Sequence, residues 1–238
     1  MIRRLLLLLL LACGPAAAQA PHSERIYLSG CGADDPVTWE FRCSAGQNSG
    51  AWRPIGVPCN WELQGFGDYT YGRWYTVKGA TPSDEEGIYR HRFDVPKQWN
   101  GQRVLLWFDG VMTDTEVFIN GQSAGDMHQG GFYRFGYDIT PLLQFGRRNL
   151  LEVKVAKHSA NASINAAERK ADWWLFGGIY RPVWLEVVPE VHMRHFVLDG
   201  QQDGTLRAQI ETANPTAGYT LRLSLKDLTD GTPLRDKT

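Results

Sequence analysis

The sequence lacks an excess of charge of either sign. Its 238 residues contain 25 Lys and Arg against 26 Asp and Glu, for a formal net charge of −1. No basic cluster is interleaved with aromatic residues, and no glycine-rich loop of phosphate-binding spacing opens a predicted helix. The composition therefore argues against a nucleic-acid partner.

Cysteine is also scarce, and its spacing does not fit a zinc site. His192 and His195 lie in a segment predicted to be extended, where they would point to opposite faces. We therefore predict no metal site and no cofactor. Outside the leader described next, the cysteines are Cys31, Cys43 and Cys59, an odd number that allows at most one intramolecular disulfide. An exported compartment permits such a bond, and proximity favours Cys31 with Cys43.

The chain has no apolar run long enough to span a bilayer, which needs about 20 residues. Residues 5–11 form a short apolar run after two arginines, and residues 18–20 read Ala-Gln-Ala. This pattern is typical of a secretory signal peptide over residues 1–20. We expect an exported protein, periplasmic or secreted. A lipoprotein anchored through Cys13 is the alternative.

Most of the chain alternates between apolar and polar residues with a period of two, which predicts strands with one buried face. Tyr89, Phe93 and Val95 would share such a face, as would the apolar residues of 151–155. Residues 104–108 are apolar on both faces, as in a central strand. Asn120-Gly121 is a two-residue hairpin signal. The sequence therefore predicts an all-β antiparallel sandwich.

The turn residues and strand patterns divide the chain into segments. We expect a lead-in segment at 21–50, a first sandwich at 51–189 and a second one at 190–238. The last segment offers about three strands, at 196–198, 206–210 and 219–225. An immunoglobulin-type sandwich needs about seven. We therefore expect the second unit to be truncated and the chain to be a fragment.

Residues 168–184 combine an acid, two adjacent tryptophans and a paired-glycine turn before a predicted strand. A sugar ring presents an apolar face and a rim of hydroxyls, so its site needs flat aromatic surface and a carboxylate acceptor. Asp172, Trp173 and Trp174 supply both. The alternative is that the two tryptophans are core residues, as large aromatics often are.

Five segments occur in an order that resembles a known family. They are VPCNWELQGFGDYTYG, GIYRHRFDVPKQWNGQRVLLWFDGV, VFINGQSAG, YRFGYDIT and DWWLFGGIYRPVWLEVVP. From about Trp52 to Pro189 the chain resembles the amino-terminal sugar-binding domain of glycoside hydrolase family 2, which includes β-galactosidases, β-glucuronidases and β-mannosidases. The remainder is similar to the start of the family's immunoglobulin-like domain.

The resemblance implies a galactose-binding-domain-like jelly roll, then an immunoglobulin-like domain and a (β/α)8 barrel. The resemblance also implies a retaining exo-β-glycosidase, in which the barrel carries two catalytic glutamates about 5 Å apart. No barrel is present here, so we expect no catalytic residue and no activity from this chain alone. The implied partners are a β-linked glycoside and the missing barrel, with a homo-oligomer as a further expectation. A stand-alone lectin-like protein is the alternative function.

Asp172 matches the acid that family β-galactosidases bring to the terminal sugar subsite. The same enzymes often have an asparagine after a tyrosine in the earlier loop, where this chain has Gly72 and Arg73 after Tyr71. Arg73 in place of that asparagine puts galactose in doubt. A guanidinium there would favour an anionic sugar, or it would form a structural ion pair. We expect Arg181 to anchor its loop through a buried pair.

Overall fold

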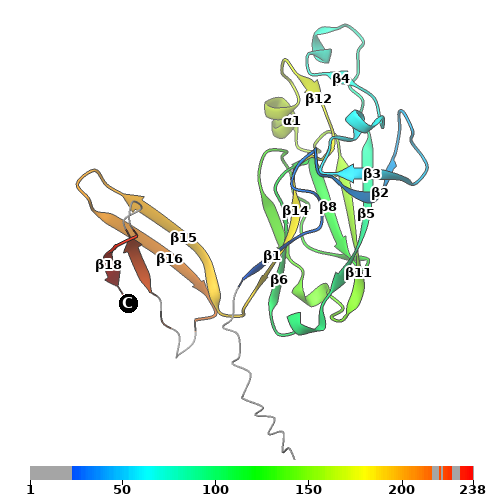
Figure 1. Ribbon diagram of the computed structural model, residues 1–238. Helices are drawn as coiled ribbons and strands as arrows, with labels where there is room; N and C mark the ends of the chain where they lie inside the picture. The colour runs from blue at the N-terminus through cyan, green and yellow to red at the C-terminus, as the bar shows by residue number, and fades with distance from the viewer. Residues whose placement is uncertain (1–22, 216–219, 221, 227–230, 238) are drawn as a thin grey trace, which may run out of the picture.

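The computed structural model describes residues 23–215, 220, 222–226 and 231–237 (Figure 1). The expected leader at 1–20, including Cys13, lies outside the described residues, as do Tyr219 and Leu221 of the last predicted strand. In the described part of the chain, no helix has the length and apolar character needed to cross a membrane.

The first unit is an all-β jelly-roll sandwich of two antiparallel sheets whose inner faces share one apolar core. One sheet has the order β1 (Glu24–Tyr27), β14 (Val183–Val188), β6 (Arg103–Phe108) and β10 (Phe135–Asp138). The other has the order β3 (Arg53–Val57), β2 (Val37–Cys43), β5 (Glu86–Val95), β11 (Arg147–Ala156), β8 (Asp114–Ile119) and β9 (Gln122–Ser123).

Short strands and helical turns lie at the ends of the sandwich. Two small ladders pair β4 (Thr70–Tyr71) with β12 (Trp174–Leu175) and β7 (Val111–Met112) with β13 (Gly178–Ile179). The helices are α1 (Ala162–Glu168) and the 3-10 turns η1 (Trp61–Gln64), η2 (Trp74–Thr76), η3 (Lys97–Trp99) and η4 (Thr140–Leu142).

The predicted strand faces are confirmed. Tyr89, Phe93 and Val95 of β5 are buried, and the apolar residues of β11 pack on the same core. Strand β6 is central, since it pairs with β14 on one side and β10 on the other. At the β8–β9 hairpin, Asn120 and Gly121 have φ of 52° and 81°, the left-handed values that a two-residue type I′ turn requires.

The sandwich begins earlier than we expected. Strands β1 and β2 both lie within residues 21–50, the segment predicted to be a lead-in, yet β1 pairs with β14 and β2 lies between β3 and β5. Trp39, Phe41 and Cys43 of β2 are buried, because alternate residues of the strand face the core. Residues 24–43 therefore belong to the fold itself.

The disulfide predicted between Cys31 and Cys43 is not formed, and both thiols are free, as is that of Cys59. Cys43 is the last, inward-facing residue of β2, where its Sγ donates to the carbonyl oxygen of Ala45 at 3.2 Å. Burial raises the pKa of the Cys43 thiol. Cys31 is exposed in the preceding loop. Proximity in sequence was misleading because one cysteine faces the core and the other faces solvent.

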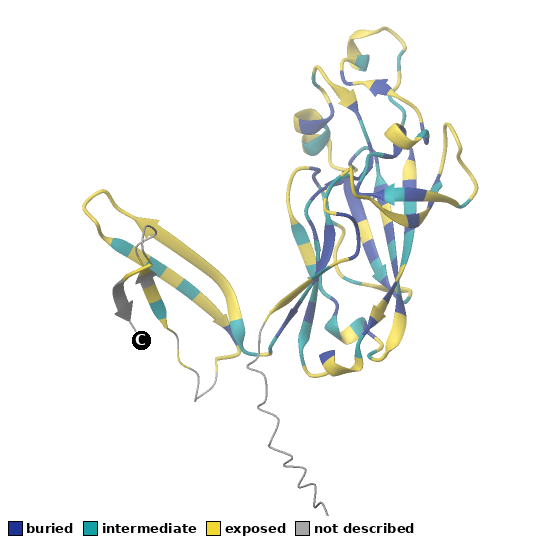
Figure 2. Cartoon of the chain, viewed as in Figure 1, coloured by how far each residue is buried: buried dark blue, intermediate teal, exposed yellow. Residues whose placement is uncertain are grey.

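Among its described residues, the second unit has two antiparallel hairpins, drawn in orange to red in Figure 1. They are β15 (His192–Gly200) with β16 (Leu206–Ala213) and β17 (Leu223–Lys226) with β18 (Pro233–Lys237). Strand β15 is almost entirely exposed (Figure 2). Its exposed residues include Met193, Phe196 and Leu198, which leave an apolar surface uncovered in the described part of the chain.

Candidate functional site

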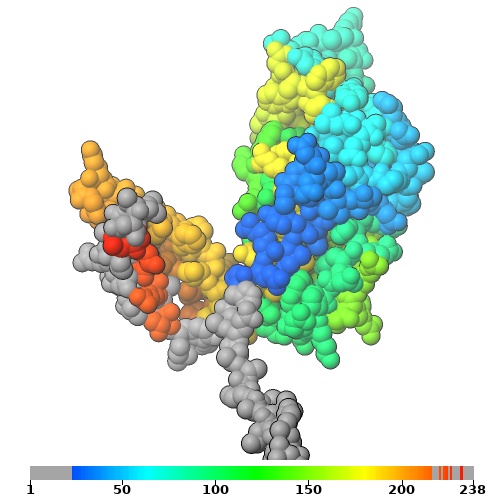
Figure 3. Space-filling view, in the orientation of Figure 1, coloured from blue at the N-terminus to red at the C-terminus, as the bar shows by residue number. Residues whose placement is uncertain are grey.

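The predicted site residues gather where β4 meets β12, at one end of the sandwich (Figure 1). Trp174 pairs with Tyr71 across this short ladder, and the backbone N–H of Gly72 donates to the carbonyl oxygen of Trp173 at 2.8 Å. We call residues 69–73 together with residues 171–174 the tip. The tip projects beyond the sandwich in the space-filling view (Figure 3).

Gly72 is required for the two strands of the tip to approach. A Cβ at this position would lie 2.2 Å from the carbonyl oxygen of Ala171 and 2.8 Å from that of Trp173. Both contacts are to backbone atoms, which cannot rotate away as a side chain can. The glycine therefore lets the loop after β4 lie directly against the loop before β12.

Asp172 receives two contacts from the opposite strand of the tip. The hydroxyl of Tyr71 donates to Asp172 Oδ1, and Arg73 Nη1 lies 3.8 Å from Asp172 Oδ2. The side chains of Arg73 and Asp172 are 59% and 65% exposed. The hydrogen bond to Asp172 raises the pKa of Tyr71. The structure thus brings Asp172 and Arg73 together at the surface, and adds Tyr71, whose direct contact with the acid we did not predict.

Aromatic rings surround this carboxylate. Trp174 packs edge-to-face with Tyr71 at a centroid distance of 5.2 Å and with Tyr69 at 6.0 Å. Trp173 and Trp174 are 46% and 51% exposed. The alternative interpretation, in which both tryptophans belong to the core, is therefore wrong. The tip presents aromatic surface to solvent beside an acid and a guanidinium.

A buried group of charges lies beneath the tip. Lys157 Nζ lies 2.7 Å from Glu62 Oε1 and 3.2 Å from Glu85 Oε2, and its side chain has no exposed surface. It also donates to the carbonyl oxygen of Asp68 at 2.6 Å. Glu62 in turn accepts the backbone N–H of Gly177 at 3.1 Å. Because Asp68 precedes β4 and Gly177 follows β12, these contacts hold both strands of the tip to the sandwich.

A buried arginine reinforces the same support. Arg169 is 2% exposed, and its Nη2 donates to the carbonyl oxygens of Lys157 at 2.6 Å and Phe176 at 2.7 Å. Burial lowers the pKa of Arg169 to about 10. The anchoring role that we predicted for Arg181 was assigned to the wrong residue, since Arg181 is exposed and stacks on the adjacent Tyr180.

The tip has the chemistry of a binding surface. Asp172 contacts a hydroxyl and a guanidinium, and neither contact pairs it with a second carboxylate. Glu168, the acid nearest in sequence, is buried and accepts the backbone N–H of Gly131 at 2.8 Å. Its contacts within the described residues therefore do not give Asp172 the second carboxylate that a glycosidase acid–base pair requires. Among the described residues, no group of three or more His, Cys, Asp or Glu is placed to hold a metal.

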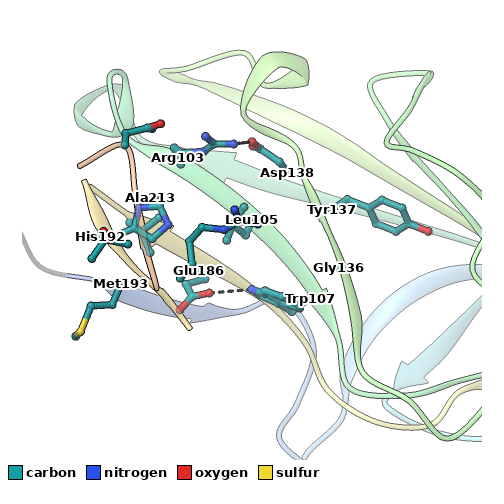
Figure 4. A pocket seen from close by; sticks show the side chains of 14 residues that line it. Arg103, Leu105, Trp107, Gly136, Tyr137, Asp138, Glu186, His192, Met193 and Ala213 are labelled. Carbon is teal, nitrogen blue, oxygen red and sulfur yellow. Dashed lines mark hydrogen bonds and ion pairs between the residues drawn. The ribbon is translucent and has the colours of Figure 1, made fainter. Parts of the chain in front are cut away.

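A hollow of about 520 Å³ lies between the outer face of β6 and β14 and the start of β15 (Figure 4). Polar groups on its walls are already engaged with one another. Arg103 forms an ion pair with Asp138, and Trp107 Nε1 donates to Glu186 Oε2 at 2.9 Å. Residues of both units line this hollow. We therefore interpret it as part of the junction between the units and not as the predicted sugar site.

Comparison with known proteins identifies similar sequences. A family model described as "Glycosyl hydrolases family 2, sugar binding domain" matches residues 29–189. A β-galactosidase of Thermoanaerobacter pseudethanolicus is 36% identical over 127 residues, which are 52% of this chain and 17% of that protein. A β-galactosidase of Bacteroides ovatus is 30% identical over 189 residues, which are 76% of this chain and 20% of that protein. The chain spans about a fifth of the length of these curated relatives.

Solved structures show the same fold. A β-glucuronidase from Faecalibacterium prausnitzii matches with a TM-score of 0.64, covering 93% of this chain and 40% of that one, at 24% identity. The match covers more of the chain than the sandwich alone contains, so it includes part of the second unit.

Proposed function

The chain belongs to glycoside hydrolase family 2, and we propose that it is the amino-terminal, non-catalytic part of an exported retaining exo-β-glycosidase. The tip would form one wall of the terminal sugar subsite. One observation supports this proposal. At the tip, Tyr71 and Arg73 contact the carboxylate of Asp172, and the exposed ring of Trp174 packs against Tyr71.

Each of these groups has a role in the proposed subsite. Asp172 accepts hydrogen bonds from sugar hydroxyls, and Trp173 or Trp174 offers a ring face to the C–H side of the sugar. Arg73 donates to an anionic group if the sugar carries one. Relatives of this chain include proteins named β-galactosidase and β-glucuronidase, and a glucuronide has the carboxylate that a guanidinium would bind.

The two catalytic glutamates would come from a barrel of the same polypeptide, with one protonating the leaving oxygen and the other attacking the anomeric carbon. In this arrangement the present chain shapes the substrate site and takes no part in proton transfer. Export through the leader, to the periplasm or the medium, is part of the proposal, and so is assembly into a homo-oligomer.

The first test is the mass of the native product, measured with an antibody against residues 60–185. We expect a band several times larger than 26.8 kDa. A single band at that mass would count against the proposal and favour the stand-alone sugar-binding protein, to which the exposed tryptophans are also suited. That protein would be retained on immobilised glycans, released by free sugar, and no longer retained after Asp172→Ala.

The second test uses the full-length enzyme with aryl β-glycosides. Asp172→Asn should lower kcat/KM about 10- to 100-fold, because a hydrogen bond to a charged group contributes about 1.5–3 kcal/mol. Arg73→Asn should lower it mainly for a glucuronide and little for a galactoside. The matched control is Glu116→Gln, an exposed carboxylate on β8. If Asp172→Asn behaves like this control, the tip is not part of the subsite.

A further inference from the structure

A groove of about 500 Å³ crosses the outer face of the six-stranded sheet. Its walls come from β2, β3, β5 and β11 and from the segment before β3, and none comes from β4 or β12. We call it the outer groove and define it by Arg53, Arg90, Arg92, Arg148, Trp52 and Glu40. It is therefore separate from the tip.

The outer groove is basic, although the chain as a whole has a net charge of −1. Four arginines line it, and Glu40 is the one carboxylate among its lining residues. Arg53 is exposed and has no carboxylate within ion-pair distance among the described residues. A local excess of arginine of this kind attracts anions by its field and offers planar, bidentate donors.

Two of the arginines make only weak, solvent-exposed ion pairs. Arg92 Nη1 lies 3.4 Å from Glu40 Oε2, with the two side chains 55% and 60% exposed. Arg148 Nε lies 4.0 Å from an oxygen of Asp94, and both side chains are still more exposed. Exposed pairs of this geometry contribute little, so an incoming anion can replace the protein carboxylates at small cost.

A tryptophan holds the remaining guanidinium in place. Arg90 lies over the ring of Trp52, with its Cζ 4.2 Å from the centroid, and its Nε donates to Glu152 at 2.9 Å. Arg42 lies over the same ring at 5.2 Å. Stacking uses the face of a guanidinium and leaves in-plane N–H groups free to donate. The groove thus contains one cation, Arg90, whose position is set by contacts within the protein.

We propose that the outer groove binds an anionic group of a glycan chain, either a uronate carboxylate or a sulfate. This site would hold the polysaccharide outside the terminal subsite. That the ligand is a glycan rests on the proposed function. Glu40, Asp94 and Glu152 each pair with one arginine of the groove, so the groove offers separate cationic positions and not a continuous basic track. A sugar chain that carries anionic groups at intervals fits such positions.

The test measures binding of the 238-residue chain to three polysaccharides: a sulfated one, a polyuronate without sulfate, and neutral dextran. Arg53→Ala/Arg92→Ala is compared with Arg194→Ala/Arg207→Ala, which removes the same charge from exposed positions on β15 and β16. We expect the groove variant to bind an anionic polysaccharide at least about tenfold more weakly than the control variant, as loss of a charge-assisted contact predicts. Comparing the two anionic polymers identifies the anion.

Three outcomes would overturn the inference. The groove variant could bind the anionic polysaccharides as tightly as the control variant does. The unmodified chain could bind dextran, or single-stranded DNA, as tightly as it binds the anionic polysaccharides. Urea unfolding of each variant checks that all remain folded. The groove variants leave every residue of the tip in place. Failure at the outer groove is therefore distinguishable from failure at the tip, which the kcat/KM of the full-length enzyme reports.

Discussion

Replacing Lys157 by methionine removes the cation from the buried group beneath the tip. The side chains of Lys157, Glu62 and Glu85 are 0%, 0% and 2% exposed, so water cannot take the place of the ammonium group. Breaking a buried ion pair by removing one partner costs about 3–5 kcal/mol, a large part of the roughly 5–15 kcal/mol that stabilises a folded domain. For a chain of this size we expect the melting temperature to fall by about 6–20 °C.

The assay is urea unfolding followed by tryptophan fluorescence, with Lys154→Met as the matched control. Lys154 lies on β11, three residues before Lys157, and its ion pair with Glu116 is 3.5 Å long between side chains that are 52% and 47% exposed. Its loss should cost less than about 1 kcal/mol. Equal costs for the two methionine variants would refute the reasoning.

The Lys157→Met cost should also depend on pH. Burial raises the pKa of Glu62, and Lys157 opposes that rise. Without the lysine the pKa of Glu62 rises further, so the folded variant binds a proton that the unfolded chain releases. Stability then increases as pH falls, and the cost should shrink between pH 8 and pH 5. The variant Lys157→Met/Glu62→Gln/Glu85→Gln, which removes all three charges, should recover much of the loss.

Three further predictions concern the tip and the core. Trp174→Ala should cost less than about 1 kcal/mol of unfolding free energy because the ring is half exposed, whereas Trp61→Ala, with no exposed surface, should cost about 3–5 kcal/mol; equal values in urea titrations would contradict this. Gly72→Ala should destabilise by about 1–3 kcal/mol through its backbone clash, while Gly200→Ala, which meets no atom within 4 Å, should be nearly neutral in thermal melts. Burial lowers the pKa of His158, so the contribution of this residue to stability is present above about pH 6.5 and is lost as pH falls below that value. The wild type should therefore lose more unfolding free energy than His158→Gln between pH 7.5 and pH 5.5. Equal losses in the two proteins would count against this.

Local patterns predicted most strands because burial alternates along a strand whatever its partners are. Pairing between distant strands has no such local signal. In β2, Trp39 and Phe41 alternate with Glu40 and Arg42, which fits a strand. The pairing of Glu40 with Arg90 of β5 depends on the path of the chain between the two strands, and no residue near Glu40 indicates that path. We therefore placed the start of the sandwich at 51, where the family resemblance becomes clear, and missed its first two strands.

The support of the tip was missed for a different reason. Lys157 continues the inward-facing series of Leu151, Val153 and Val155, so its position predicts burial. Its charge argues against burial unless a partner is present. The partners Glu62 and Glu85 come from η1 and from the segment just before β5, and nothing near Lys157 in the sequence indicates them. A lysine in phase with buried strand residues was the available signal, and it was overlooked.

Arg73 shows how structure changes the weight of a prediction made from one substituted residue. As an ion pair it has little structural value, since 3.8 Å between two mostly exposed groups contributes at most about 1 kcal/mol. Tyr71, fixed by its pairing with Trp174, makes the closer contact with Asp172 and would keep the acid in place if the guanidinium turned away. Arg73 is therefore free to exchange a protein carboxylate for one on a ligand. A neutral sugar offers no such exchange, so an anionic sugar is the ligand that we propose for this pair of residues.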